Sequence, residues 1–393
     1  MKVNKKTILI QKQERDRLIG LPYVSRDQLP QAKKLLANDL VKIIIGPRRA
    51  GKSVFALELL KDQNFAYLNF EDEKLRDIED NDEIIDLLDE VYNKPKYFLF
   101  DEIGRVKDWE MWVNKLHRRG RNLVLTGSNA NLLSGELATA LTGRHFTIEI
   151  YPFSYSEFLR AKNLSGGATN EFMALGGFPE VVTKDIDSKY YLKSLIDSTI
   201  LKDIVLRHIV GMPSRISLLA NHFFANITGH YTINSLKNLL EFSSFASIDK
   251  YISYLEETFL LISLMRFSYK YKTQAKAARK IYTIDNGFVG TSFNFSPDYG
   301  KLLENLVFME LVRRGYRPNL DLFYYQTRNG KEVDFILKRG YKVEQLIQVC
   351  YNLDNDDTKK REESAIKEAQ EELSCKNSLI ITGDNLEEWL LKK

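Results

Sequence analysis

The chain has 393 residues, 44% of them hydrophobic, which is enough for two or three domains with buried cores. Its 57 basic and 53 acidic residues leave a net charge of only +4, so any nucleic-acid-binding surface has to be local. Cys350 and Cys375 lack metal-ligand spacing and the five histidines are scattered, so neither a zinc site nor a disulfide framework is indicated. We find no signal-peptide pattern and no apolar run long enough to span a bilayer, so we expect a cytoplasmic protein without a membrane partner.

The first motif lies between an apolar run at residues 42–45 and a helix with apolar periodicity. It reads GPRRAGKS and fits the G-x-x-x-x-G-K-[ST] pattern of a P-loop, in which backbone N–H groups and a helix N-terminus bind phosphate. Lys52 would neutralise the β- and γ-phosphates of ATP, and the Ser53 hydroxyl would ligate Mg²⁺. Arg48 and Arg49 either clamp phosphate or lie in solvent. The predicted nucleotide site comprises Gly46, Pro47, Arg48, Arg49, Ala50, Gly51, Lys52 and Ser53.

Two later strands are expected to end at the same site. The apolar run YFLF at residues 97–100 delivers Asp101 and Glu102, and we expect Asp101 to bind Mg²⁺ and Glu102 to polarise the attacking water. The alternative for this acidic pair is a helix N-cap with a solvated neighbour. The run NLVLTGSN ends in Ser128 and Asn129, which are suited to sensing the γ-phosphate or orienting the water, although the same residues are ordinary turn formers.

The first part of the chain alternates apolar strands with helical stretches. This pattern predicts an α/β fold, with a parallel sheet covered by helices on both faces. Ligands on such sheets bind at the carboxyl ends of the strands, where the P-loop and both polar strand ends lie. The expected strands occupy residues 41–46, 65–73, 96–102, 122–129 and 145–153.

Five stretches in combination resemble the AAA+ class ATPases of archaea and bacteria with a DExx-type Walker B box, in which the ATPase domain precedes a nuclease-like domain. They are GPRRAGKS, LFDEI followed by a Trp-bearing helix, LTGSNANLLS, LTGRHFTIEIYPFSYSEFL and LGGFPEVV. The resemblance implies a sensor strand between the two Walker strands and assembly into rings or other homo-oligomers. In a ring, a neighbour's arginine can stabilise transition-state charge. By similarity Arg144 is that arginine, although a surface ion pair would explain it equally well.

After residue 160 the alternation of strands and helices stops. Three helices and two strands predict a winged helix, with Thr232 and Ser247 as N-caps of the second and third helices. The expected helices cover residues 214–229, 232–242 and 247–261, and the strands cover 261–270 and 279–285. We therefore divide the chain into a P-loop ATPase domain at 1–160, a helical lid and winged-helix domain at 161–290, and a nuclease-like domain at 291–393.

The predicted hairpin of this winged helix is basic and aromatic. Between residues 266 and 280 it has no acidic residue, and Phe267, Tyr269 and Tyr271 lie among its cations. The cations would neutralise phosphates and the rings would stack on exposed bases, which makes DNA the expected partner. The alternatives are a solvated wing and a protein contact. The predicted nucleic-acid-binding residues are Arg266, Lys270, Lys272, Lys276, Arg279 and Lys280.

The last hundred residues have a helix-strand-strand-strand-helix-strand order that resembles the PD-(D/E)XK nuclease fold. Such nucleases hold Mg²⁺ between carboxylates, and the resemblance assigns Glu304 and Asp334 as metal ligands, with Gln348 at the next ligand position. Where the family has a lysine, this sequence has Cys350, and the neutral Gln348 weakens metal binding. Lys338, which lies on the same strand face as Asp334 at a period of two, is the only nearby substitute, unless it is a surface lysine. A degenerate domain kept for binding or assembly is therefore favoured over an active nuclease.

Three functions remain open at this point. The first is Mg²⁺-dependent ATP hydrolysis coupled to remodelling of DNA, the second is an ATP-gated nuclease, and the third is a regulatory or scaffolding ATPase that acts on protein partners. The basic hairpin favours the first function, and the missing lysine argues against the second. Nothing in the sequence excludes the third.

Overall fold

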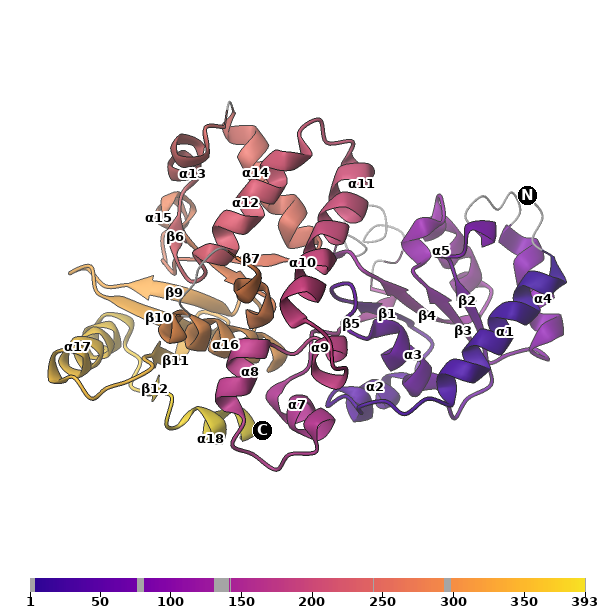
Figure 1. Cartoon of the computed structure of the whole chain (residues 1–393), viewed down its shortest axis with the longest axis horizontal. Coiled ribbons are helices and arrows are strands. Elements are labelled where there is room, and N and C mark those ends of the chain that lie inside the picture. Colours follow the sequence, from indigo (N-terminus) through magenta and orange to yellow (C-terminus); the bar gives the residue numbers. More distant parts are fainter. Residues whose placement is uncertain are drawn as a thin grey trace. The chain divides into compact units, whose positions relative to one another are not determined.

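The computed structural model describes residues 4–75, 81–130, 141, 143–242, 244–292 and 298–392 (Figure 1). Contacts divide the chain into two units, Met1–Tyr151 and Pro152–Lys393. The dividing point is close to the boundary expected at residue 160, and the second expected boundary, at 290/291, falls within the second unit. Within the described ranges, no helix combines the length and the apolar character needed to cross a membrane.

A five-stranded parallel sheet forms the centre of the first unit (Figure 1). The strand order is β2-β3-β4-β1-β5, so β4 lies between the two strands that lead into the P-loop and the acidic pair, as the resemblance implied. Strands β1 to β4 are buried over nearly their whole length, as expected for a parallel sheet covered on both faces. The strands are β1 (Val41–Ile45), β2 (Phe65–Asn69), β3 (Tyr97–Asp101), β4 (Asn122–Gly127) and β5 (His145–Glu149).

Successive residues of β3 pack into cores on opposite faces of this sheet. Leu99 belongs to a core that includes Phe55 and Leu59 of α3, whereas the Phe100 ring stacks on Trp112 of α5 with ring centroids 5.0 Å apart. Helices therefore cover both faces, which confirms the predicted α/β arrangement. The helices are α1 (Lys5–Ile19), α2 (Leu29–Leu35), α3 (Lys52–Leu60), α4 (Asn81–Val91) and α5 (Trp109–Arg118).

The second unit begins with a mostly helical segment. Thr232 caps α13 as predicted, because its hydroxyl accepts the Ser235 N–H at 3.0 Å. The predicted Ser247 cap is wrong: α14 begins at Phe245, and Ser244 caps it one turn earlier by accepting the Ala246 N–H at 3.2 Å. The helices are α7 (Tyr155–Lys162), α8 (Thr169–Leu175), α9 (Pro179–Thr183), α10 (Ser188–Thr199) with a π-helical continuation (Ile200–Val205), α11 (Leu206–His208), α12 (Pro213–Ala225), α13 (Ile233–Leu240) and α14 (Phe245–Glu257).

An antiparallel three-stranded sheet follows these helices. Its order is β6-β8-β7, built from β6 (His230–Tyr231), β7 (Leu261–Met265) and β8 (Arg279–Thr283). The segment between β7 and β8 is not a simple turn, because it contains the short helix α15 (Tyr271–Lys276). The order of three helices and two main strands agrees with the expected pattern, while its assignment as a winged helix stays a prediction.

A four-stranded sheet of order β12-β11-β10-β9 closes the second unit. Strands β9 to β11 are antiparallel, and β12 joins β11 in parallel after the crossover helix α17. The element order is the one expected from the sequence, and the nuclease-like assignment stays a prediction. The elements are a 3₁₀ segment (Asn286–Thr291), α16 (Tyr299–Arg313), β9 (Leu322–Gln326), β10 (Glu332–Arg339), β11 (Lys342–Val349), α17 (Asp356–Leu373), β12 (Ser378–Ile381) and α18 (Leu386–Leu391).

Candidate functional sites

The loop of residues 46–53 needs glycine at both ends. Gly46 has φ +147°, and a Cβ there would lie 2.0 Å from the Ile150 carbonyl oxygen. Gly51 has φ +93° and immediately precedes α3, so the free N–H groups of the first turn of α3 open onto the loop. The close passage of the backbone and the left-handed turn explain the two glycines, and the helix N-terminus offers donors for an anion.

The predicted phosphate and Mg²⁺ residues converge at the end of β3. The Ser53 hydroxyl donates to Asp101 Oδ1 at 2.9 Å, although the two residues are 48 positions apart. The buried Lys52 ammonium donates to the Pro47 carbonyl oxygen at 2.9 Å and lies 3.8 Å from Glu102 Oε1. A hydroxyl and a carboxylate that already meet are a set of oxygen donors that suits Mg²⁺.

Asp101 is fully enclosed by neighbouring strands. Burial raises the pKa of Asp101 to about 6; the Glu102 charge adds to this, while hydrogen bonds from Thr126 and Ser53 oppose it. The Thr126 hydroxyl also accepts the Glu102 N–H at 2.9 Å, and the Tyr67 hydroxyl donates to Asp101 Oδ2 at 3.3 Å. The sequence analysis missed Thr126 and Tyr67; the only signal for Thr126 is a polar residue inside an otherwise apolar strand.

Glu102 is held in a left-handed backbone conformation, with φ 54° and ψ 43°. This conformation is uncommon for a residue with a side chain and recurs at functional sites. Its carboxylate lies near Lys52 on one side and accepts the Ser128 hydroxyl at 3.1 Å on the other. Asn129 follows Ser128 after the carboxyl end of β4 and is also buried.

The arginines around the loop differ in their surroundings. Arg48 lies 3.5 Å from Glu71, whereas the Arg49 and Arg144 side chains are exposed. The backbone of Arg144 opens β5, because its carbonyl accepts the Val41 N–H at 3.0 Å. Arg26, which the sequence analysis did not single out, is buried. It donates to the Ala50 carbonyl at 3.1 Å and to the Tyr151 carbonyl, so it links the loop to the residues that follow β5.

Most of the predicted nucleic-acid-binding residues form a surface on the segment between β7 and β8. Lys270, Lys272 and Lys276 are exposed, and together with Arg266 they line a hollow of about 480 Å³. The Tyr269 and Tyr271 side chains are 69% and 83% exposed, which leaves both rings accessible. Arg279 is only half-buried at the start of β8. We call the residues 266–276 the basic segment.

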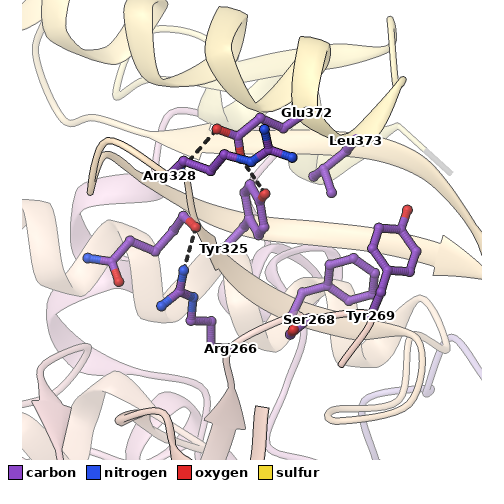
Figure 2. A pocket seen from close by; sticks show the side chains of 9 residues that line it. Arg266, Ser268, Tyr269, Tyr325, Arg328, Glu372 and Leu373 are labelled. Atoms are coloured by element: carbon purple, nitrogen blue, oxygen red, sulfur yellow. Dashed lines mark hydrogen bonds between the residues drawn. The ribbon is translucent and has the colours of Figure 1, made fainter. Parts of the chain in front are cut away.

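A second, smaller pocket of about 170 Å³ adjoins the basic segment (Figure 2). Arg266 and Arg328 line it, and Arg266 is fixed by donating to the Gln326 carbonyl at 2.8 Å. Arg328 lies in the β9–β10 turn and was not predicted. Phe267 departs from the prediction: it is buried against Phe323 with ring centroids 5.6 Å apart, so it is not available to stack on a base.

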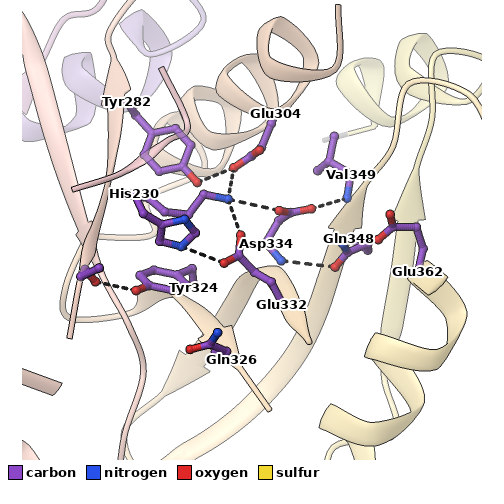
Figure 3. Close-up of polar contacts among 12 residues, drawn as sticks. His230, Tyr282, Glu304, Tyr324, Gln326, Glu332, Asp334, Gln348, Val349 and Glu362 are labelled. Atoms are coloured by element: carbon purple, nitrogen blue, oxygen red, sulfur yellow. Dashed lines mark hydrogen bonds and ion pairs between the residues drawn. The ribbon is translucent and has the colours of Figure 1, made fainter. Parts of the chain in front are cut away.

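Lys280 also departs from the prediction, because it does not reach the surface. Its side chain is 2% exposed, and its ammonium lies 2.5 Å from Glu304, 2.9 Å from Glu332 and 3.3 Å from Asp334. Figure 3 labels these three carboxylates. Lys280 was expected to contact nucleic acid, whereas the structure places it among the carboxylates expected to bind metal. We call Lys280 and these three carboxylates the acidic cluster.

The other residues of the predicted metal site have partners of their own. Gln348 accepts the Asp334 N–H at 3.3 Å and donates to Glu362 at 2.5 Å. Lys338 turns away and donates to the Gly340 carbonyl at 3.0 Å, and the Cys350 thiol bonds the Asn352 carbonyl. In the described part of the chain, no group of three or more His, Cys, Asp or Glu side chains is arranged to hold a metal ion. The acidic cluster already holds a cation, the Lys280 ammonium, among the carboxylates where the metal was expected.

Comparison with known proteins gives family matches over residues 38–159 and 167–390. Residues 38–159 match an AAA domain model, residues 167–299 match a domain of unknown function (DUF8612), and residues 299–390 match another (DUF4143). Uncharacterized protein MJ1544 of Methanocaldococcus jannaschii is 37% identical over 368 residues, which cover 88% of this chain and 81% of that protein. An uncharacterized protein of Haemophilus influenzae is 34% identical over 357 residues, covering 84% and 87%.

The chain belongs to the same family as these relatives, and it contains an AAA domain. The AAA match spans β1 to β5 and so includes residues 46–53, Asp101 and Glu102, which places the first unit in the class of P-loop ATPases. Among solved structures, the Walker-type ATPase PABY2304 of Pyrococcus abyssi covers 70% of this chain and 99% of its own, at 15% identity and a TM-score of 0.43. That likeness is partial.

The family matches also divide the acidic cluster of this AAA-domain protein. Lys280 lies in the segment matched at 167–299, whereas Glu304, Glu332 and Asp334 lie in the segment matched at 299–390. The ion pairs therefore join two segments that are matched separately.

Proposed function

We propose that this AAA-domain protein hydrolyses ATP with Mg²⁺ and couples hydrolysis to the binding and remodelling of DNA. The observation that carries the ATPase proposal is the contact of Ser53 with Asp101 beside the Lys52–Glu102 pair. The loop N–H groups and the first turn of α3 would bind phosphate oxygens. The Lys52 ammonium would donate to these oxygens in place of the Pro47 carbonyl. Ser53 and Asp101 would hold Mg²⁺, which when bound neutralises charge on the phosphates.

The Lys52–Glu102 pair gives the proposal a second step. The Lys52 ammonium lies 3.8 Å from the Glu102 carboxylate, and phosphate would compete for that ammonium. Glu102 would then keep the Ser128 hydroxyl and be free to polarise a water molecule. Asn129, buried beside Ser128, would orient that water or sense the γ-phosphate.

Two substitutions test this site. Lys52→Ala removes the phosphate cation, so ATP binding and hydrolysis should be lost. Glu102→Gln keeps the size of the side chain but removes the base, so ATP should still bind and remain uncleaved. The matched controls are Lys61→Ala, exposed just after α3, and Glu90→Gln, exposed on α4. Hydrolysis at the wild-type rate in Glu102→Gln would rule out the assigned base.

The DNA proposal is supported by the basic segment. Three exposed lysines and two exposed tyrosines on one short stretch combine phosphate contacts with stacking platforms. The adjoining pocket adds the cation of Arg328 beside Arg266, together with the carboxylate of Glu372 (Figure 2). A buried core and a short helix hold this surface, so it is presented by folded structure and not by a free loop.

A charge-matched pair of variants tests the DNA surface. The triple variant Lys270→Ala/Lys272→Ala/Lys276→Ala should bind DNA more weakly and reduce the slope of log K against log salt by about 2 for single strands. The control removes three exposed lysines from α17: Lys359, Lys360 and Lys367. If both triple variants bind alike, the basic segment is not the interface.

A protein-directed ATPase is the second candidate, and a separate observation favours it. Leu206, Ile209 and Met212 are 67%, 91% and 63% exposed around the end of α11. Exposed apolar side chains that are close in sequence are typical of protein contacts. An ATPase that is indifferent to every DNA tested would move this candidate to first place.

We also propose that the chain works as a homo-oligomer, such as the rings that its resemblance to AAA+ ATPases implies, with Arg144 acting on a neighbour's nucleotide. The exposed Arg144 side chain stands at the start of the edge strand β5. An arginine in that position would supply charge to a site that its own subunit does not complete.

A further inference from the structure

The acidic cluster is built from two parts of the second unit (Figure 3). Lys280 comes from β8 of the three-stranded sheet, Glu304 comes from α16, and Glu332 and Asp334 come from β10 of the four-stranded sheet. These elements are separated by at least 24 residues of sequence from Lys280, so only folding brings the charges together. The cluster is therefore a tertiary feature with no local motif.

Further contacts near Lys280 also join the three-stranded sheet to α16 and β10. The Tyr282 hydroxyl, also from β8, donates to Glu304 Oε1 at 2.7 Å. On β6, His230 Nε2 lies 2.8 Å from Glu332 Oε2. Asp334 has a further partner on its own sheet, because its Oδ2 accepts the Val349 N–H at 2.9 Å. Each carboxylate is thus held by Lys280 and by a second group.

The charge on Lys280 is maintained by its surroundings. Burial opposes that charge, but the nearby carboxylates, Glu304 first, outweigh burial and raise the pKa of Lys280 above its ordinary value. A divalent ion would need these same oxygens at about 2.0–2.6 Å, in the space and with the charge that the ammonium already uses. An ammonium this close would also repel a second cation.

We propose that Lys280 is the permanent cation of the acidic cluster, taking the place of a divalent metal ion and fastening the three-stranded sheet to α16 and β10. The cluster is then a structural lock and not a hydrolytic centre. If Lys280 replaces the metal ion, no metal-bound water has to be positioned. This agrees with the hydrogen bonds that Gln348, Lys338 and Cys350 make to other groups.

The substitution K280M tests the lock in the full-length chain, because methionine keeps the chain length of the side chain and removes its charge. The buried Asp334 and the partly buried Glu304 and Glu332 lose their cation, so the thermal midpoint should fall by roughly 6–12 °C. The control is K301M on α16, whose ammonium is exposed and 3.8 Å from Asp298, and its midpoint should stay within about 2 °C of wild type.

Mn²⁺ added without nucleotide provides the decisive readout. In K280M the freed carboxylates should bind the ion, raising the midpoint by roughly 5–10 °C at 100 times the dissociation constant. Wild type and K301M should show no such response. The triple variant K280M/E304Q/D334N leaves fewer unpaired charges, so it should be more stable than K280M and should not respond to Mn²⁺. If K280M fails to fold, recovery of folding in this triple variant tests the same ion pairs.

Two results would overturn the proposal. One is Mn²⁺ stabilisation of the wild type that D334N abolishes, because the metal would then bind beside Lys280. The other is a K280M variant as stable as K301M, because the ion pairs would then fasten nothing. Far-ultraviolet circular dichroism of each variant shows whether the chain is folded before the titration.

Discussion

Asp101→Asn should make the first unit more stable at pH 8 while removing the carboxylate proposed to hold Mg²⁺. The Asp101 carboxylate is buried and accepts hydroxyl hydrogens from Ser53, Thr126 and Tyr67. An asparagine can keep these contacts, because its oxygen accepts from Ser53 and Thr126 while its amide donates to the Tyr67 oxygen. The substitution therefore removes the cost of a buried charge and little else.

The size of the effect follows from the pKa. Burial raises the pKa of Asp101 from 3.8 to about 6, so the folded state favours the protonated acid. This contribution is fully present below pH 3.8 and is lost as the pH rises through 6. Above pH 6 the ionised group costs about 3 kcal/mol of folding free energy, which is the shift of roughly two units at 1.36 kcal/mol per unit.

The assay is urea unfolding followed by tryptophan fluorescence in a Trp389→Phe background. Trp109 and Trp112 then remain, both on α5, so the signal reports the first unit. Asp101→Asn should gain up to about 3 kcal/mol at pH 8 and nearly nothing at pH 4. Asp62→Asn, whose side chain is 65% exposed, is the control and should change stability by about 0.5 kcal/mol or less. A difference between Asp101→Asn and wild type that does not vary with pH would refute the reasoning.

Two further predictions concern activity. Thr126→Val removes a hydrogen bond that lowers the pKa of Asp101. The acid limb of the pH profile of kcat/KM for ATP should therefore move upward from near pH 6, by about one unit. An unchanged acid limb would mean that Thr126 does not influence the proposed metal ligand. Arg144→Ala should lose hydrolysis but keep ATP binding, and mixing it with Lys52→Ala should restore about a quarter of the wild-type rate, because that fraction of random interfaces combines an intact loop with an intact neighbouring arginine. No recovery on mixing would mean that Arg144 does not act between subunits.

The nucleotide site was largely accessible from sequence because its chemistry is local. The P-loop is a contiguous motif, and Asp101 and Glu102 follow an apolar strand directly. Thr126 and Tyr67 were missed because their contacts depend on which strands are neighbours in the sheet, and this is a tertiary property. Arg26 reaches the loop from 24 residues upstream, in a segment without a motif.

Lys280 shows why a run of charge can mislead. It ends a basic stretch whose lysines at 270, 272 and 276 are exposed, and a reading along the chain groups all of them together. Yet β8 is buried from Lys280 to Thr283, and the partners of Lys280 lie on elements that follow later in the chain. Burial of an ion pair is decided by packing, so composition near Lys280 could not reveal it.

The measurement that tests the central claim most directly is steady-state ATP hydrolysis with Mg²⁺, alone and with single-stranded, duplex and branched DNA, while the same tubes are scored for DNA cleavage. A DNA-coupled ATPase should hydrolyse ATP faster with at least one DNA, leave that DNA uncut, and lose the stimulation in the Lys270→Ala/Lys272→Ala/Lys276→Ala variant but not in the α17 control. Hydrolysis that no DNA changes would contradict the coupling, and absence of Mg²⁺-dependent hydrolysis would contradict the ATPase itself.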